Sequence, residues 1–236
     1  MIPKRAIFYW EGKPMDWLRR QAIHSFRILN PGWEVEIITG DWPVGDTWRF
    51  TPLRSDYARY KALADRGGFY FDTDIVFVRP IPDSWLVQPL AAPLDDQRKI
   101  AHIAAIGSVA GHRFFLQMLR DCHERAARNR VLACQSFGTL ALSRYRMDQD
   151  TFGIPVEAFI THHPSEIEKI WSDPIEVPSW SIGVHWYGGD RVSEEIEPQY
   201  NERTWANWNN IVGQALTVTL GRSAEAETLC EQHGIQ

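Results

Sequence analysis

The chain has 236 residues, 44% of them hydrophobic and 23% charged, which is typical of a globular protein with a sizeable core. Its formal net charge is −5, and no stretch concentrates lysine and arginine, which argues against a nucleic-acid substrate. No apolar run is long enough to span a bilayer, and the N-terminus lacks the apolar core of a signal peptide.

The cysteines indicate the compartment of the protein, and the tryptophans indicate the kind of ligand that it binds. Cys122, Cys134 and Cys230 have unrelated spacings and no metal-type pairing, so we expect reduced, mostly buried thiols. We therefore expect a cytoplasmic protein, and any membrane contact would lie at the inner face of the membrane. The 11 tryptophans supply the core and also favour flat surfaces on which sugars or bases stack.

The N-terminal third begins with a strand, a helix and a second strand. Residues 6–10 are apolar and aromatic, residues 15–29 carry apolar side chains at helical spacing, and residues 33–39 alternate. A strand, helix and strand in this order are typical of a parallel nucleotide-binding sheet.

A helix and a further strand follow in residues 54–82. Ser55 is a candidate N-cap of this helix, and Asp56 in the first turn suits the helix dipole. Gly67 and Gly68 end the helix, and residues 69–78 are aromatic and β-branched, as in a buried strand.

The period of two along this strand predicts that Tyr70, Asp72 and Asp74 point to one face. Two carboxylates on a buried face repel each other and lose hydration, so they need a cation. Hard divalent ions such as Mg²⁺ and Mn²⁺ prefer oxygen ligands and bridge to substrate phosphates. The alternative is that both aspartates mark the solvated end of a strand.

The helix and strand together read Ser55-Asp56-x-x-Arg59 and Gly67-Gly68-x-Tyr70-x-Asp72-x-Asp74. This pattern resembles the DXD signature of glycosyltransferase family 32. That family includes capsular polysaccharide transferases and mannosyltransferases, and it shares its core with the clostridial glucosylating toxins. The resemblance covers most of the chain, and its first third is the most specific part.

The resemblance implies an α/β, GT-A-type nucleotide-diphospho-sugar transferase fold with a mostly parallel central sheet flanked by helices. We expect residues 1–221 to form a single catalytic domain and residues 222–236 a polar tail. The implied activity is hexosyl transfer, dependent on Mn²⁺ or Mg²⁺, from a UDP- or GDP-sugar to an acceptor. A glycan, a lipid-linked glycan or another molecule is the acceptor, and the anomeric configuration is retained.

The resemblance also implies roles for the signature residues. Asp56 and Arg59 contact the donor sugar, where the carboxylate accepts and the guanidinium donates hydrogen bonds. Ser55 and Tyr70 lie beside the donor, Asp72 and Asp74 hold the metal, and Asp72 also reaches the ribose. Catalysis is thus assigned to four residues: Asp56, Arg59, Asp72 and Asp74. Without the resemblance, Asp56 and Arg59 form only an i,i+3 ion pair.

Three residues outside the signature are also carried over. Trp10, at the end of the first strand, is implied to stack on the base, and its alternative is a core tryptophan. His185 is implied to approach the metal and the diphosphate, and its alternative is a buried structural histidine. Gly138 is implied to line the sugar cavity, although Gly138-Thr139 replaces the family's Gly-Pro pair. Asp190 follows Gly188-Gly189 where the family has Ser-Trp, which leaves the third metal ligand open.

The remaining chain alternates between short strands and helices. We expect an apolar segment within 83–93, strands at 100–109, 159–163 and 182–187, and helices at 114–128, 135–142 and 205–220. His162 and His163 would point to opposite faces of their strand, so we expect a structural or solvent-exposed pair.

Two other functions fit parts of the pattern. In a haloacid-dehalogenase-type phosphatase Asp72 would be a phosphorylated nucleophile, but that fold usually has its aspartates in the first strand. A non-catalytic carbohydrate-binding module would use tryptophan platforms without metal or nucleotide. Phosphatase assays and calorimetric titration with UDP and Mn²⁺ distinguish these functions from sugar transfer.

Overall fold

The computed structural model describes residues 1–40, 48, 50–128, 136–142 and 144–221. The chain forms two compact units. The first unit comprises Met1–Lys13, Gly32–Asp72 and Pro82–Val156, and the second comprises Pro14–Pro31, Thr73–Ile81 and Glu157–Gln236. The expected polar tail, residues 222–236, lies outside the described residues, as do Cys134 and Cys230.

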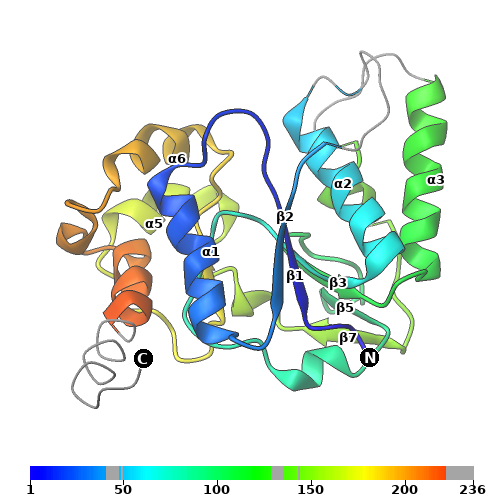
Figure 1. The fold of residues 1–236 in the computed structure, drawn as a ribbon, viewed down its shortest axis with the longest axis horizontal. Helices are drawn as coiled ribbons and strands as arrows, with labels where there is room; N and C mark the ends of the chain where they lie inside the picture. Colours follow the sequence, from blue (N-terminus) through cyan, green and yellow to red (C-terminus); the bar gives the residue numbers. More distant parts are fainter. Residues whose placement is uncertain (41–47, 49, 129–135, 143, 222–236) are drawn as a thin grey trace. The chain divides into compact units, whose positions relative to one another are not determined.

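The first unit is built on a six-stranded sheet (Figure 1). Its strands, in spatial order, are β2 (Glu34–Ile38), β1 (Arg5–Tyr9), β3 (Gly68–Phe71), β6 (Ala105–Ser108), β5 (Leu90–Pro93) and β7 (Thr151–Ile154). The pairs β1–β2, β1–β3 and β5–β7 are parallel, whereas β6 runs antiparallel to both β3 and β5. The predicted α/β class, with a mostly parallel central sheet, is confirmed.

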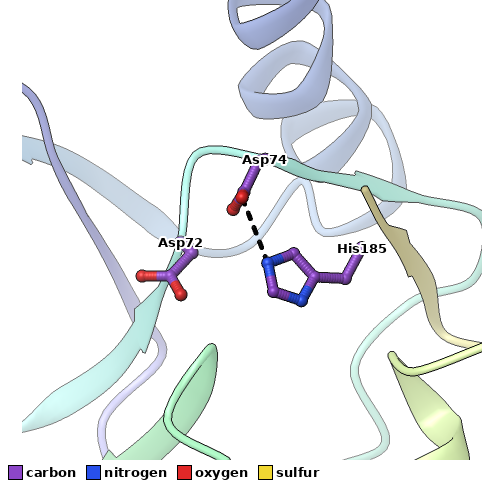
Figure 2. Close-up of side chains that lie close together, drawn as sticks. All are labelled: Asp72, Asp74 and His185. Carbon is purple, nitrogen blue, oxygen red and sulfur yellow. Dashed lines mark ion pairs between the residues drawn. The ribbon is translucent and has the colours of Figure 1, made fainter. Parts of the chain in front are cut away.

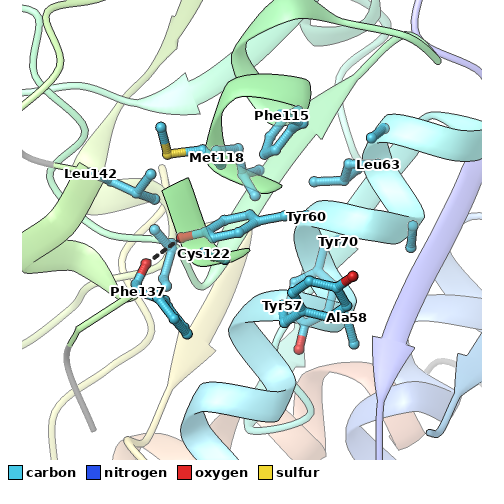
Figure 3. Packing of buried hydrophobic residues seen from close by; sticks show 14 of the residues in the cluster. Tyr57, Ala58, Tyr60, Leu63, Tyr70, Phe115, Met118, Cys122, Phe137 and Leu142 are labelled. Atoms are coloured by element: carbon cyan, nitrogen blue, oxygen red, sulfur yellow. Dashed lines mark hydrogen bonds between the residues drawn. The ribbon is translucent and has the colours of Figure 1, made fainter. Parts of the chain in front are cut away.

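Two long helices flank this sheet and lie side by side, α2 (Thr51–Arg66) and α3 (Arg113–Arg128) (Figure 1). Tyr60 of α2 and Phe115 of α3 pack with ring centroids 6.0 Å apart in the core of the unit (Figure 3). Burying such rings removes large apolar surfaces from water, and this stabilises the helix pair. Shorter helices complete the unit: η2 (Asp83–Leu86) and α4 (Thr139–Leu142).

The second unit packs α1 (Trp17–Leu29) on a two-stranded antiparallel sheet of β4 (Ile75–Phe77) and β8 (Gly183–His185). The Ser25 hydroxyl accepts a hydrogen bond from the Phe77 amide at 2.8 Å and so ties α1 to β4. Further helices follow in this unit: η3 (Val156–Ala158), which begins at the last residue of the first unit, η4 (Pro164–Glu166), α5 (Ile167–Ser172), α6 (Arg191–Ile196), η5 (Glu197–Gln199), η6 (Trp205–Asn207) and residues 211–221. None of the helices described has the length and apolarity needed to cross a bilayer.

The predicted strand over residues 69–78 is in fact two strands. β3 ends at Phe71, a turn contains Thr73 and Asp74, and β4 begins at Ile75 in the other sheet. The prediction that a strand's alternation places Asp72 and Asp74 on one face is therefore wrong. Both aspartates instead lie where the chain changes from one sheet to the next.

Three other predicted boundaries also change. α2 begins at Thr51 with Phe50 as its N-cap, so Ser55 is not a cap; Pro52 in the first turn favours this early start. Residues 159–163 form no strand, and His162 is buried whereas His163 is exposed and caps η4. The expected helix over 205–220 divides into the short η6 and the helix at 211–221.

Candidate donor and metal site

The two aspartates of the DXD motif occupy different units. Asp72 extends the end of β3, where its amide donates to the Ala104 carbonyl at 2.8 Å and prolongs the pairing with β6. Asp74 lies two residues later, immediately before β4 of the second unit.

Asp74 meets His185 at the start of the β4–β8 sheet. Ile75 pairs with His185 in the strand register, which brings the preceding carboxylate to the imidazole. Figure 2 shows the pair, in which Asp74 Oδ2 lies 3.1 Å from His185 Nε2. The Gly188 amide donates to the same oxygen at 2.6 Å, and the Trp186 amide donates to the Asp74 backbone carbonyl at 3.1 Å.

These contacts keep Asp74 ionised. Burial alone would raise the pKa of Asp74, but His185, the Gly188 amide and Arg19 outweigh it and lower the pKa to about 2. Asp74 therefore carries its negative charge at neutral pH, as a metal ligand must. The His185 ring also packs against the Tyr187 ring, with 4.4 Å between centroids, which limits its rotation.

Arg19 and Glu197 form a buried ion pair that contacts Gly188, the residue whose amide binds Asp74. Arg19 of α1 pairs with Glu197 and with Asp16, the latter at 2.6 Å, and donates to the Gly188 carbonyl at 3.2 Å. Trp186 Nε1 donates to Glu197 Oε1 at 2.7 Å. Burial raises the pKa of Glu197 to about 6, against the opposing effect of Arg19.

Asp56, Arg59 and Asp72 form a second charged group, within the first unit. Arg59 Nη2 donates to Asp72 Oδ1 at 2.8 Å, and Arg59 Nη1 lies 3.5 Å from Asp56 Oδ1. The Arg59 guanidinium also lies 4.2 Å above the centre of the Tyr70 ring, a cation–π contact. Asp56, Arg59, Tyr70 and Asp72, which the family resemblance assigns to the donor or the metal, therefore lie close together.

Burial sets the electrostatics of this group. The Arg59 side chain is 3% exposed, and its Nε and Nη1 atoms are buried without a hydrogen-bond partner among the described residues. Burial alone lowers the pKa of Arg59, but Asp72, Tyr70 and Asp56 outweigh it and raise the pKa. Burial also raises the pKa of Asp56 to about 7, although Arg59 opposes this shift.

The other predicted donor-binding residues have different surroundings. Ser55 Oγ lies 3.0 Å from the Tyr70 hydroxyl, so the serine supports Tyr70 rather than capping a helix. Trp10 is half-buried, and its Nε1 donates to the Lys13 carbonyl at 2.8 Å. Gly138 is buried, and its carbonyl accepts from the Ala141 and Leu142 amides of α4.

Sequence reasoning missed Arg19, Asp16 and Glu197. An arginine on an amphipathic helix ordinarily faces water, and Glu197 lies in a charged stretch of the sequence, which is ordinarily solvated. One usable signal was present, because Asp16 directly precedes the apolar pattern of α1 and is its N-cap, accepting from the Arg19 amide at 2.9 Å.

Residues 18–91 match the family model described as a glycosyltransferase sugar-binding region containing a DXD motif. This range includes Asp56 and Arg59 as well as Asp72 and Asp74. The chain contains a glycosyltransferase-like sugar-binding region. The match supports the enzyme class predicted from the sequence, a glycosyltransferase.

Two solved glycosyltransferases are similar to the chain. PaToxG glycosyltransferase aligns with a TM-score of 0.43 and 13% identity, over 61% of this chain and 68% of its own. The apo form of the glycosyltransferase GlyE of Streptococcus pneumoniae TIGR4 aligns with a TM-score of 0.47 and 13% identity, over 94% of this chain and 64% of its own. The aligned part thus spans roughly two thirds of each structure. No curated protein sequence matches the chain.

Proposed function

We propose that the protein is a metal-dependent glycosyltransferase of the GT-A type that uses a UDP- or GDP-sugar. One observation carries the proposal: the ionised Asp74 contacts His185 two residues after Asp72, within a DXD motif. A glycan, a lipid-linked glycan or another molecule would accept the sugar with retention of configuration. We propose further that residues 1–221 act together as the catalytic domain.

Asp72, Asp74 and His185 are the proposed metal ligands. Two atoms that bind an octahedral ion in neighbouring positions at about 2.1 Å lie about 3.0 Å apart. The 3.1 Å between Asp74 Oδ2 and His185 Nε2 fits this spacing. Only Thr73 separates Asp72 from Asp74, so the covalent chain keeps the third ligand within reach. Mn²⁺ or Mg²⁺ held there would act as a Lewis acid on a diphosphate leaving group.

Asp56 and Arg59 are the proposed contacts of the donor sugar. Arg59 is fixed by Asp72 and by the Tyr70 ring, so it is positioned before any ligand arrives. Its Nε and Nη1 donate no hydrogen bond within the described structure, which suits sugar hydroxyls as acceptors. Asp56 is the matching acceptor, and Ser55 holds the Tyr70 hydroxyl through a contact of 3.0 Å.

Trp10 and Gly138 are the remaining proposed contacts of the donor. Trp10 directly follows β1 and is half-buried, which suits a residue that stacks on uracil or guanine. Gly138, at the start of α4, is retained as a residue that lines the sugar cavity. The Asp72 carboxylate is engaged by Arg59, which does not favour its use as a phosphatase nucleophile.

A panel of nucleotide sugars tests the function. The purified protein is incubated with UDP- and GDP-sugars, with Mn²⁺ or with EDTA, and released nucleotide is measured. We expect hydrolysis of at least one donor with Mn²⁺ and none in EDTA. Turnover that is undiminished in EDTA would refute the metal assignment. Release of inorganic phosphate from simple phosphomonoesters, with no turnover of nucleotide sugars, would favour the phosphatase instead.

A further inference from the structure

We propose that Arg19 and Glu197 are positioning residues that hold Asp74 in place through the turn at Gly188. This inference rests on the proposed function, because it assigns these residues to the metal-binding carboxylate. All of the residues involved belong to the second unit.

Gly188 links Asp74 to Arg19 through its two backbone groups. Its amide donates to Asp74 Oδ2 at 2.6 Å, and its carbonyl accepts from Arg19 Nη2 at 3.2 Å. A peptide segment gripped on both sides has little freedom to rotate. The Arg19 guanidinium therefore determines where the amide that orients the carboxylate points.

Arg19 is itself held by two carboxylates. Asp16 Oδ2 lies 2.6 Å from Nη1, and Glu197 contacts both terminal nitrogens, with Nη2 to Oε1 at 3.1 Å. The Arg19 and Glu197 side chains are only 12% and 7% exposed. A bidentate pair of this kind fixes geometry more firmly than a single contact does.

Glu197 extends the same network to the strand that carries His185. Its Oε1 atom accepts from Trp186 Nε1 at 2.7 Å, and the Trp186 amide donates to the Asp74 carbonyl at 3.1 Å. Trp186, which follows His185, and Gly188, which binds Asp74, are thus both attached to one ion pair. Such an arrangement supports both proposed ligands, Asp74 and His185.

The packing leaves no room for a side chain at position 188. A Cβ atom there would lie 2.4 Å from Arg19 Nη2, 2.6 Å from Glu197 Oε1 and 3.2 Å from Asp74 Cβ. Glycine therefore permits the close approach of all three side chains. Gly189, by contrast, has open space around it.

The test separates positioning from simple destabilisation. Arg19→Met leaves Glu197 buried without its cation, so this variant is expected to be unstable. The double variant Arg19→Met/Glu197→Gln removes the buried charge as well, keeps an acceptor for Trp186 and should recover much of the melting temperature. Arg79→Met is the control, since Arg79 binds the Pro178 carbonyl at 3.1 Å in the same unit and does not contact Asp74 in the described structure.

Two quantities are measured for each variant: the dissociation constant for Mn²⁺ alone, by calorimetry, and the hydrogen exchange of the Gly188 amide, by NMR. For the double variant we expect a dissociation constant ~10- to 100-fold higher than that of the parent and faster exchange at Gly188, whereas Arg79→Met changes neither. Parent-like values in the double variant would overturn the inference. If the parent binds no Mn²⁺, the proposed metal site fails, and amide exchange still decides whether Arg19 holds Gly188 on Asp74.

Discussion

Asp74 combines burial with two contacts that favour its charged form, His185 and the Gly188 amide. Asp74→Asn keeps an oxygen for the Gly188 amide but removes the charge. We expect transferase activity to fall at least ~100-fold and Mn²⁺ affinity to be lost, because a neutral amide is a poor ligand for a hard cation. Activity and calorimetric titration with Mn²⁺ are the measurements.

Asp190→Asn provides a control in the same unit. Asp190 is the N-cap of α6, where its carboxylate accepts from the Val192 amide at 2.9 Å, and asparagine is an equally good N-cap. This variant should keep its activity, Mn²⁺ affinity and melting temperature. Similar losses in both variants would mean that the Asp74 effect is general to carboxylate removal and not specific to metal binding.

The raised pKa of Asp56 makes the stability of the folded protein depend on pH. The direction of this pKa shift is opposite to that of Asp74, whose pKa is lowered. Burial raises the pKa of Asp56 from 3.8 to about 7, so the folded state binds the proton more tightly than the unfolded chain. The protonated Asp56 side chain contributes up to about 4 kcal/mol to the free energy of unfolding. This contribution is fully present below pH ~4 and is lost as pH rises to ~7. Asp56→Asn should remove this slope.

The check is urea unfolding of parent and variant between pH 4 and 8. The difference in unfolding free energy between the two proteins should change across this window, with the parent losing stability relative to Asp56→Asn as pH rises. A constant difference would show that Asp56 ionises in the folded protein much as it does in the unfolded chain.

At the scale of elements, the junction between α2 and β3 depends on a glycine. Gly67 has φ = 66°, and a Cβ there would lie 2.6 Å from the Ala110 amide nitrogen and 2.7 Å from the Ser108 carbonyl oxygen. Gly67→Ala should therefore cost roughly 2–4 kcal/mol, because it adds a clash with backbone to an unfavourable φ. Gly111→Ala has the same kind of strain, with φ = 70° but open space, and should cost only about 1–2 kcal/mol.

Chemical denaturation of the two glycine variants provides the comparison. If Gly67→Ala is no less stable than Gly111→Ala, the close approach of α2 to the loop after β6 does not limit substitution at this position.

Elements with strong local periodicity were predictable from the sequence. The helices α1 and α3 carry apolar residues at helical spacing, and β1 and β2 follow the predicted parallel order. The division of residues 69–78 was not predictable, because apolar and aromatic side chains continue on both sides of Asp72 and Asp74. Only the partner strands, β6 for β3 and β8 for β4, decide that the chain changes sheet there. β7 was missed because the short Thr151–Ile154 contains a glycine.

In the candidate site, too, contacts between residues near in sequence were predictable, and contacts between distant residues were not. Asp56 and Arg59 lie one turn apart on a single helix, so their meeting could be predicted from spacing. The contact of Asp74 with His185 spans more than a hundred residues and was inferred only through a family resemblance. Arg19 and Glu197 form an ion pair that no local pattern indicates, because its residues belong to different elements.

At the scale of the whole molecule, the proposed function predicts how ligands change thermal stability. A ligand that binds only the folded chain stabilises it by about 2.7 kcal/mol at a concentration of 100 Kd. For a chain of this size, that corresponds to a rise in Tm of roughly 5–10 °C. We expect UDP or GDP to produce such a rise in the presence of Mn²⁺, with ADP much weaker, because the base and the diphosphate must both be recognised.

The Asp74→Asn variant should lose the part of the Tm rise that depends on Mn²⁺, whereas Asp190→Asn should keep it. Equal shifts in EDTA and in Mn²⁺ would contradict a metal that neutralises the diphosphate, since the nucleotide would then bind through protein side chains alone.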